Sequence, residues 1–142
     1  MWTKLLSIFR PKIDRKHIRI LVIEDTEVDQ RVACAAIERG GYTSMRACDG
    51  KTGVNMAKEQ KPDMIILDYN LPDAKGPQIC EILKNCTETH NIPVLFLTSM
   101  DSPESIINCY EKGGTNYLSK PISPGMLLKH IELTLKDKNE EC

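Results

Sequence analysis

Three short runs of consecutive apolar residues divide the chain, and each of them stops at a polar residue. Runs of this length, apolar on both faces, are typical of strands buried in a parallel sheet. The runs are Ile18–Ile23, interrupted by one arginine, Met64–Leu67 and Val94–Leu97. We therefore expect three central strands whose carboxyl ends all carry polar side chains.

Segments with helical spacing of apolar residues separate these strands. Ser102-Pro103 and Ser123-Pro124 each combine an N-cap residue with proline at the first helical position, and Gly40-Gly41 is a stop signal. The expected helices are 26–39, 51–60, 77–86, 103–110 and 124–135, and two weaker strands are expected at 42–48 and 116–119. The inward face expected for helix 26–39 is Val28, Val32, Ala35, Ala36 and Ile37.

Strands that alternate with helices over short loops require right-handed crossovers and a parallel sheet covered on both faces. The sequence thus predicts an α/β fold. The element count and length favour a flavodoxin-like, doubly wound, five-stranded parallel sheet of order 2-1-3-4-5 with five flanking helices.

Length and charge set the domain organisation. With 142 residues, 41% of them hydrophobic, the chain suits one core, and we expect a domain over 18–137 and a C-terminal tail over 138–142. Residues 1–17 form a basic N-terminal extension with five Lys or Arg against one Asp, so the rest is more acidic than the net charge of -1 indicates. Nucleic-acid binding is therefore disfavoured.

The N-terminal extension has an amphipathic pattern, with apolar residues at Trp2, Leu5, Leu6, Ile8 and Phe9. Residues 1–16 are interpreted either as a helix that covers the domain's own surface or a frayed end, or as a weak contact with an anionic membrane. No apolar run approaches the roughly 20 residues of a spanning helix. We expect a cytoplasmic protein, with peripheral attachment to the inner membrane as the alternative.

The six cysteines are scattered without a CxxC pair. They are interpreted as small core hydrophobes and surface thiols of a reducing compartment rather than as disulfides or metal ligands.

Polar residues at four strand ends are expected to meet at one edge of the sheet: Glu24, Asp25, Asp68, Thr98 and Lys120. Three carboxylates at one edge repel one another unless a cation lies among them, and an all-oxygen set suits Mg²⁺ (or Mn²⁺). A carboxylate such as that of Asp68 can form an aspartyl phosphate. Lys120 offers positive charge and Thr98 a hydroxyl donor to transferred oxygens.

These residues carry a clear resemblance. Ile23-Glu24-Asp25, the stretch from Asp68 to Pro72, Leu97-Thr98-Ser99 and the stretch from Tyr117 to Pro121 resemble the receiver domain of two-component response regulators. The resemblance covers about Ile18 to Lys136 and is closest to stand-alone, chemotaxis-regulator-like members.

The resemblance implies that Asp68 accepts a phosphoryl group from a histidine kinase or phosphotransfer protein. It also implies that Asp25, Asp68 and the backbone carbonyl of Asn70 bind Mg²⁺, with Glu24 helping through water. The domain would assist its own phosphorylation and dephosphorylation without being a conventional enzyme, and no organic cofactor is expected.

The resemblance further implies that Thr98 and Lys120 hold the phosphoryl oxygens, and that Thr98 and Tyr117 form a switch in which the aromatic ring turns inward. It implies a cis peptide bond between Lys120 and Pro121. Met100 occupies a position that tunes dephosphorylation in the family, and because its apolar side chain cannot orient a hydrolytic water, we expect a long-lived phosphoryl state.

Two other chemistries fit less well. A haloacid-dehalogenase-like phosphatase needs a second aspartate two residues after the nucleophile, where this chain has Asn70. A flavodoxin-type carrier needs a phosphate-binding loop after the first strand, where Glu24 and Asp25 would repel phosphate. The remaining alternatives are an intermediate phosphorelay carrier and a phosphorylation-independent interaction module.

Output is expected to run through protein contacts, because the chain ends six residues after Lys136 and leaves no room for an effector domain. The face built from residues 103–136 is expected to bind a downstream protein target or a second copy of the chain.

Overall fold

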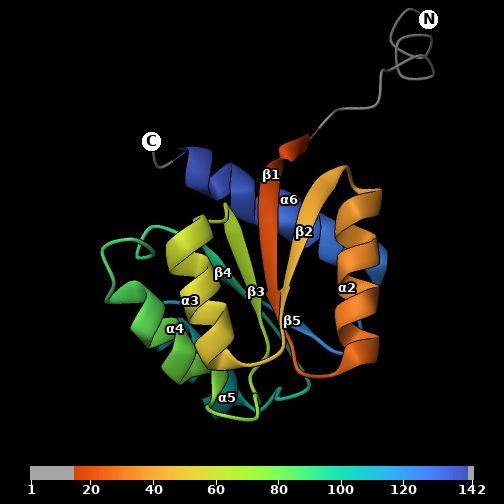
Figure 1. The fold of residues 1–142 in the computed structure, drawn as a ribbon. Helices are drawn as coiled ribbons and strands as arrows, with labels where there is room; N and C mark the ends of the chain where they lie inside the picture. The colour runs from red at the N-terminus through yellow and green to blue at the C-terminus, as the bar shows by residue number, and fades with distance from the viewer. Residues whose placement is uncertain (1–14, 141–142) are drawn as a thin grey trace, which may run out of the picture.

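The computed structural model describes residues 15–140, with side chains described for 15–136. Five parallel strands form one sheet of order β2-β1-β3-β4-β5, and helices cover both of its faces (Figure 1). This arrangement confirms the predicted flavodoxin-like order. The strands are β1 (Arg15–Ile23), β2 (Tyr42–Ala47), β3 (Met64–Leu67), β4 (Val94–Thr98) and β5 (Asn116–Ser119), and the helices are α2 (Glu27–Arg39), α3 (Gly50–Gln60), α4 (Gly76–Lys84), α5 (Pro103–Glu111) and α6 (Pro124–Glu140).

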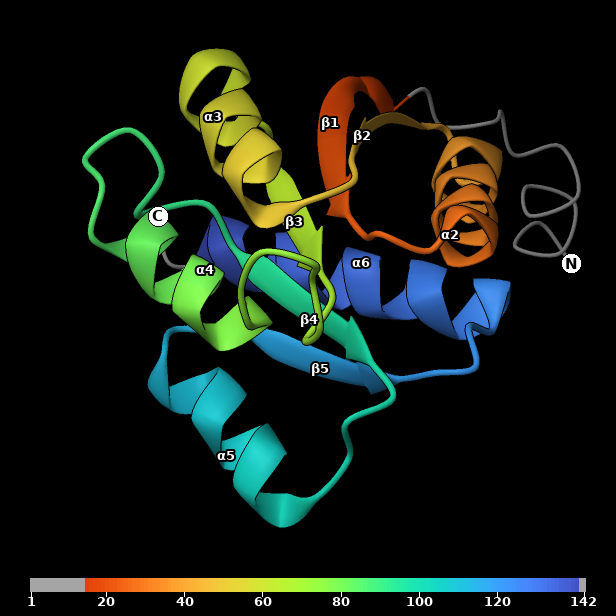
Figure 2. The ribbon, with the colours of Figure 1, turned by 60° about the horizontal axis from the view of Figure 1, so that its bottom comes forward.

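Strand β3 lies at the centre of the sheet, and all four of its residues are buried. Alternate side chains of β1, β3 and β4 enter two separate hydrophobic clusters, because successive strand residues point to opposite faces. One cluster packs against α3, α4 and α5, and the other against α2 and α6, as Figure 2 shows. The central strands are therefore clamped on both faces.

The inward face of α2 differs from the predicted one. Val28 is 67% exposed and Ala35 is exposed, whereas Ala36 and Ile37 are buried as expected. Val32 is only partly buried. The residues that α2 buries against the sheet are Gln30, Ala33, Cys34, Ala36 and Ile37, and four of them follow the i, i+3, i+4, i+7 spacing of a helix face. The prediction was wrong at Val28 and Ala35 because it placed the buried face too far round the helix, and it left out Gln30, Ala33 and Cys34.

The first strand begins at Arg15 rather than at Ile18, with a register shift between Arg15 and Arg19. The Arg15 guanidinium donates hydrogen bonds of 3.0 Å to Tyr42 Oη and Glu132 Oε1, and it lies 5.2 Å from the centre of the Tyr42 ring. Residues 15–17 of the expected extension thus belong to strand β1, while its amphipathic segment lies outside the described residues. Helix α6 runs to Glu140, past the expected domain end.

Five cysteines fall within the described range, and all of them are free thiols. Cys34, Cys80 and Cys109 are buried, Cys86 is partly buried and Cys48 is exposed. The mixture agrees with the interpretation of core and surface thiols. Within residues 15–140, none of the helices combines the length and apolar character needed to cross a membrane.

Candidate functional site

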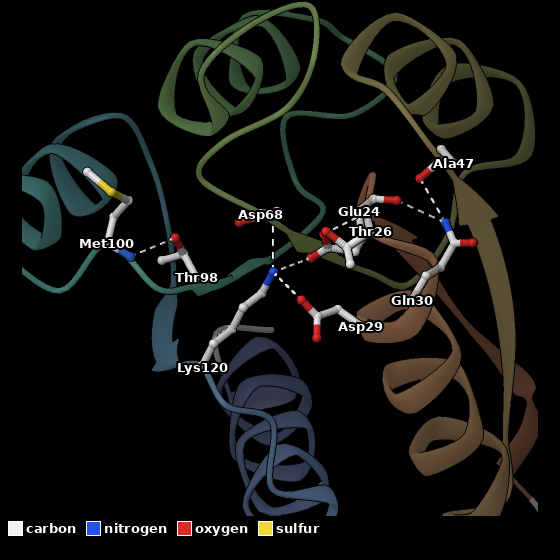
Figure 3. Close-up of polar contacts among 9 residues, drawn as sticks. All are labelled: Glu24, Thr26, Asp29, Gln30, Ala47, Asp68, Thr98, Met100 and Lys120. Atoms are coloured by element: carbon white, nitrogen blue, oxygen red, sulfur yellow. Dashed lines mark hydrogen bonds and ion pairs between the residues drawn. The ribbon is translucent and has the colours of Figure 1, made fainter.

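The ammonium of Lys120 lies among carboxylates from three parts of the chain (Figure 3). Its Nζ is 2.8 Å from Glu24 Oε2, 2.9 Å from Asp29 Oδ2 and 3.3 Å from Asp68 Oδ2. Glu24 follows β1, Asp68 follows β3 and Lys120 follows β5, so the parallel strands deliver all three to one edge of the sheet. The predicted meeting of these residues is confirmed.

Glu24, Asp25 and Asp68 form a compact set of acids, with one carboxylate oxygen of each within 4.8 Å of the others. Glu24 is 3% and Asp68 7% exposed, whereas Asp25 is open to solvent. All-oxygen donor sets with an open side suit a hard divalent cation that keeps some of its waters. The residues present therefore fit Mg²⁺ or Mn²⁺.

Burial dominates the electrostatics of Glu24. It raises the pKa of this carboxyl from 4.5 to about 7, against the hydrogen bonds from Lys120 and the Thr26 amide, and the charge of Asp68 raises it further. Burial alone would lower the pKa of Lys120, but its bonds to Glu24 and Asp29 and the charge of Asp68 outweigh that effect and raise it. Lys120 is thus a permanent cation in this site.

Thr98 is fully buried at the end of β4 and joins the site through its backbone and its hydroxyl. Its carbonyl accepts a 2.9 Å hydrogen bond from the Lys120 amide, and its Oγ1 accepts one of 3.1 Å from the Met100 amide. Tyr117 packs partly buried against the hydrophobic core and donates its hydroxyl to the Met100 carbonyl. The peptide bond between Lys120 and Pro121 is cis, as expected.

The loop after β3 is held by its own hydrogen bonds. Asn70 forms a bridge with Lys75, and its Oδ1 accepts a 2.7 Å hydrogen bond from Lys75 Nζ. The Gly76 amide donates to the Tyr69 carbonyl at 2.6 Å, and a Cβ on Gly76 would lie 2.9 Å from Tyr69 Cα. Only glycine allows so close a backbone approach. The loop thereby fixes the backbone on the C-terminal side of Asp68.

Two further residues of the site were not predicted from the sequence. Asp29, in the first turn of α2, pairs with Lys120. Buried Gln30 donates from Nε2 to the carbonyls of Glu24 and Ala47, both at 3.1 Å, and so ties α2 to the ends of two strands. Gln30 could have been found from the sequence, because it is a polar residue on the face of α2 that packs on the sheet, in a helix that begins next to the site.

Comparisons with known proteins agree on one family. The family model described as "Response regulator receiver domain" matches residues 20–132. The chain is 35% identical over 118 residues to the phosphate regulon transcriptional regulatory protein PhoB of Escherichia coli, covering 83% of this chain and 52% of PhoB. It is 32% identical over 117 residues to protein PilH of Pseudomonas aeruginosa, covering 82% of this chain and 97% of PilH.

Solved structures give the same result. The chemotaxis protein CheY4 of Vibrio cholerae superposes with a TM-score of 0.78 at 27% identity, covering 82% of this chain and 97% of CheY4. The chain spans about half the length of the first curated relatives that it matches. The matched family model, the order of the strands and the residues at the strand ends agree. This chain belongs to the response regulator receiver domain family.

Proposed function

We propose that this receiver domain accepts a phosphoryl group on Asp68 from a histidine kinase or phosphotransfer protein of a two-component system. The observation that carries the proposal is the position of Lys120 Nζ, which lies 3.3 Å from Asp68 Oδ2. Glu24 and Asp25 lie beside Asp68 at the same edge of the sheet. A lysine so placed offsets charge on oxygens transferred to Asp68.

The transfer exchanges one bond of phosphorus for another. A carboxylate oxygen of Asp68 attacks the phosphorus of a phosphohistidine, the P–O bond forms as the P–N bond breaks, and the electron pair leaves with the imidazole nitrogen. Lys120 and the Thr98 hydroxyl would bind the phosphoryl oxygens. Bound Mg²⁺ or Mn²⁺, held by Glu24, Asp25, Asp68 and the Asn70 carbonyl, would supply positive charge that offsets the acids.

The output would be a change in protein contacts. Thr98 and Tyr117 both bond to Met100, so movement of the Thr98 hydroxyl toward a phosphoryl group would disturb the loop that Tyr117 holds. That loop precedes α5, where Ile107 is 56% and Tyr110 46% exposed. We propose that the 103–136 face binds a downstream protein or a second copy; a phosphorelay carrier and a phosphorylation-independent interaction module are the alternatives.

A direct experiment tests the phosphoacceptor. Purified wild type and Asp68→Asn are incubated with acetyl phosphate, with and without Mg²⁺, and covalent phosphate is measured by intact mass and Phos-tag electrophoresis. We expect labelling of wild type only, and only with the cation. Equal labelling of Asp68→Asn would remove Asp68 from this role.

A second experiment tests the output. Size-exclusion chromatography and pull-down with wild type are compared with and without beryllofluoride, which stands in for the phosphoryl group. A change in assembly or partner retention is expected for a switch, and identical results would favour the phosphorylation-independent module. Transfer of labelled phosphate to a second histidine protein would favour the relay carrier.

The place of action is proposed to be the cytoplasm. The amphipathic pattern of residues 1–14 supports a weak additional contact with anionic membranes. Co-sedimentation with anionic liposomes tests this by comparing the full chain with a version that begins at Arg15, which keeps the bonds of Arg15 to Tyr42 and Glu132. Equal sedimentation of the two would exclude a membrane role for residues 1–14.

A further inference from the structure

Lys120 has three ammonium hydrogens and three carboxylate partners. Two partners, Glu24 and Asp68, belong to the acid set that fits a divalent cation, whereas Asp29 does not. A cation bound by the acid set would therefore draw Glu24 and Asp68 away from Lys120. Of the three partners, only Asp29 would keep its contact with the lysine.

Asp29 comes from a different element than the other acids. It lies in the first turn of α2, where the positive end of the helix dipole favours a carboxylate even without Lys120. Its side chain is 31% exposed and that of Lys120 is 14% exposed, so the pair lies at the rim of the site, not in the core. Figure 3 shows Asp29 approaching Lys120 from the side opposite Thr98.

A phosphoryl group on Asp68 and the Asp29 carboxylate make the same demand on Lys120. Both are anionic oxygen acceptors, and the 2.9 Å contact with Asp29 already occupies one donor in a charge-assisted hydrogen bond. A cation that takes Glu24 and Asp68 makes two ammonium hydrogens available, but the Asp29 contact still holds Nζ toward α2. All three hydrogens can face phosphoryl oxygens only if this contact lengthens or breaks. Asp29 thus holds Lys120 at the site before phosphorylation. After phosphorylation it opposes the movement of the Lys120 ammonium toward the phosphoryl oxygens.

We infer that Asp29 is a positioning residue that competes with the phosphoryl group for Lys120 and so weakens the phosphorylated state. The inference rests on the proposed phosphorylation of Asp68. It gives the chain a fourth acid that acts through the lysine rather than through the cation.

Beryllofluoride binding in saturating Mg²⁺ measures this competition without hydrolysis. Affinity is determined by calorimetry, with ¹⁹F NMR to count the bound species. Because the pair is charge-assisted but partly exposed, Asp29→Asn is expected to tighten binding about threefold to tenfold. Asp29→Ser, which also suits a helix N-terminus, is expected to act in the same direction and guards against a folding defect in one variant.

Glu27→Gln is the matched control. Glu27 lies in the same turn of α2, carries the same charge and bonds to Arg31 at 2.6 Å with a 75% exposed side chain. Its substitution is expected to leave the affinity unchanged. Equal tightening by Glu27→Gln and Asp29→Asn would reduce the effect to general charge repulsion and overturn the inference.

A Lys120→Ala background separates action through the lysine from direct repulsion. Asp29→Asn is expected to give no gain in beryllofluoride affinity when Lys120 is absent, and an undiminished gain there would overturn the positioning role. Unchanged or weaker binding by Asp29→Asn alone would overturn it as well, while wild type still binds. Failure of wild type to bind beryllofluoride would instead overturn the proposed function, and the inference with it.

Discussion

The Tyr117 hydroxyl donates a hydrogen bond to the backbone carbonyl of Met100, which joins edge strand β5 to the loop between β4 and α5. Tyr117→Phe removes this bond and leaves the ring in place. We expect a loss of about 0.5–1.5 kcal/mol in the free energy of unfolding. Hydrogen exchange should rise at residues 99–102.

Urea denaturation and amide exchange measure the two effects, with Tyr110→Phe on exposed α5 as control. Unchanged exchange in the loop of Tyr117→Phe would show that the hydroxyl does not hold it.

Gly76→Ala tests the backbone contact behind Asp68. The added Cβ would lie 2.9 Å from Tyr69 Cα, and because backbone cannot yield as a side chain can, we expect a destabilisation of about 1–3 kcal/mol and a loss of phosphorylation rate. Gly125→Ala is the matched control, since nothing lies within 4 Å of its Cβ position. Thermal and urea denaturation compare them, and equal stability of both variants would contradict the contact.

The raised pKa of Glu24 leads us to expect that the free energy of unfolding of the metal-free protein depends on pH. This pKa is about 7 when folded against 4.5 when unfolded, so the folded state binds the proton more tightly. This contribution is fully present below about pH 4.5 and is lost as pH rises to about 7. The difference in the free energy of unfolding between Glu24→Gln and wild type should therefore rise by about 1–3 kcal/mol in favour of Glu24→Gln from pH 5 to pH 8.

Urea titrations at both pH values, in the presence of a chelator, measure this gain. Saturating Mg²⁺ should reduce it, because the cation then stabilises the ionised carboxylate. A gain of opposite sign would mean that Glu24 is already ionised in the folded protein at pH 5.

Met100 predicts a long-lived phosphoryl group. Its amide and carbonyl are bonded to Thr98 and Tyr117, while its side chain is 37% exposed and offers no group to orient water. We expect Met100→Gln to shorten the phosphoryl lifetime several-fold, and the apolar Met100→Leu to leave it unchanged. Loss of labelled phosphate after removal of the donor is the measurement. A wild-type half-life of seconds without a phosphatase would contradict the prediction.

The fold followed from the sequence because each central strand contains a short apolar run that ends at a polar residue, so that few other arrangements bury these runs. Element boundaries were less secure. The start of β1 at Arg15 depends on the contacts of its guanidinium with Tyr42 and Glu132, which lie far along the chain. The face of α2 was misjudged because the helix offers apolar residues on two sides, and the side that is buried, with Ala33 and Cys34, is the one whose Gln30 bonds to strand-end carbonyls.

The site was predictable to the extent that it follows from strand order. Glu24, Asp68, Thr98 and Lys120 stand directly at strand ends, and parallel strands place such residues at one edge. Asp29 stands on a helix, and its contact with Lys120 depends on the angle at which α2 leaves the site and on the reach of a long side chain. Neither quantity can be read from residue spacing.

Strand β3, which presents Asp68, is enclosed by β1 and β4 and has no solvent-exposed residue, whereas β5 lies at the margin with none of its residues fully buried. Strand β3 has backbone hydrogen bonds to a neighbouring strand on both sides, whereas β5 has a partner strand on one side only, so β5 is the easier of the two to displace. Under the proposed function, the chemical event lies on the stiffer of these two strands and the response to it on the more easily displaced one. Atoms that would hold an attack geometry then lie on a strand that is paired on both sides, and the surface that would change for a partner includes a strand that is paired on one side only.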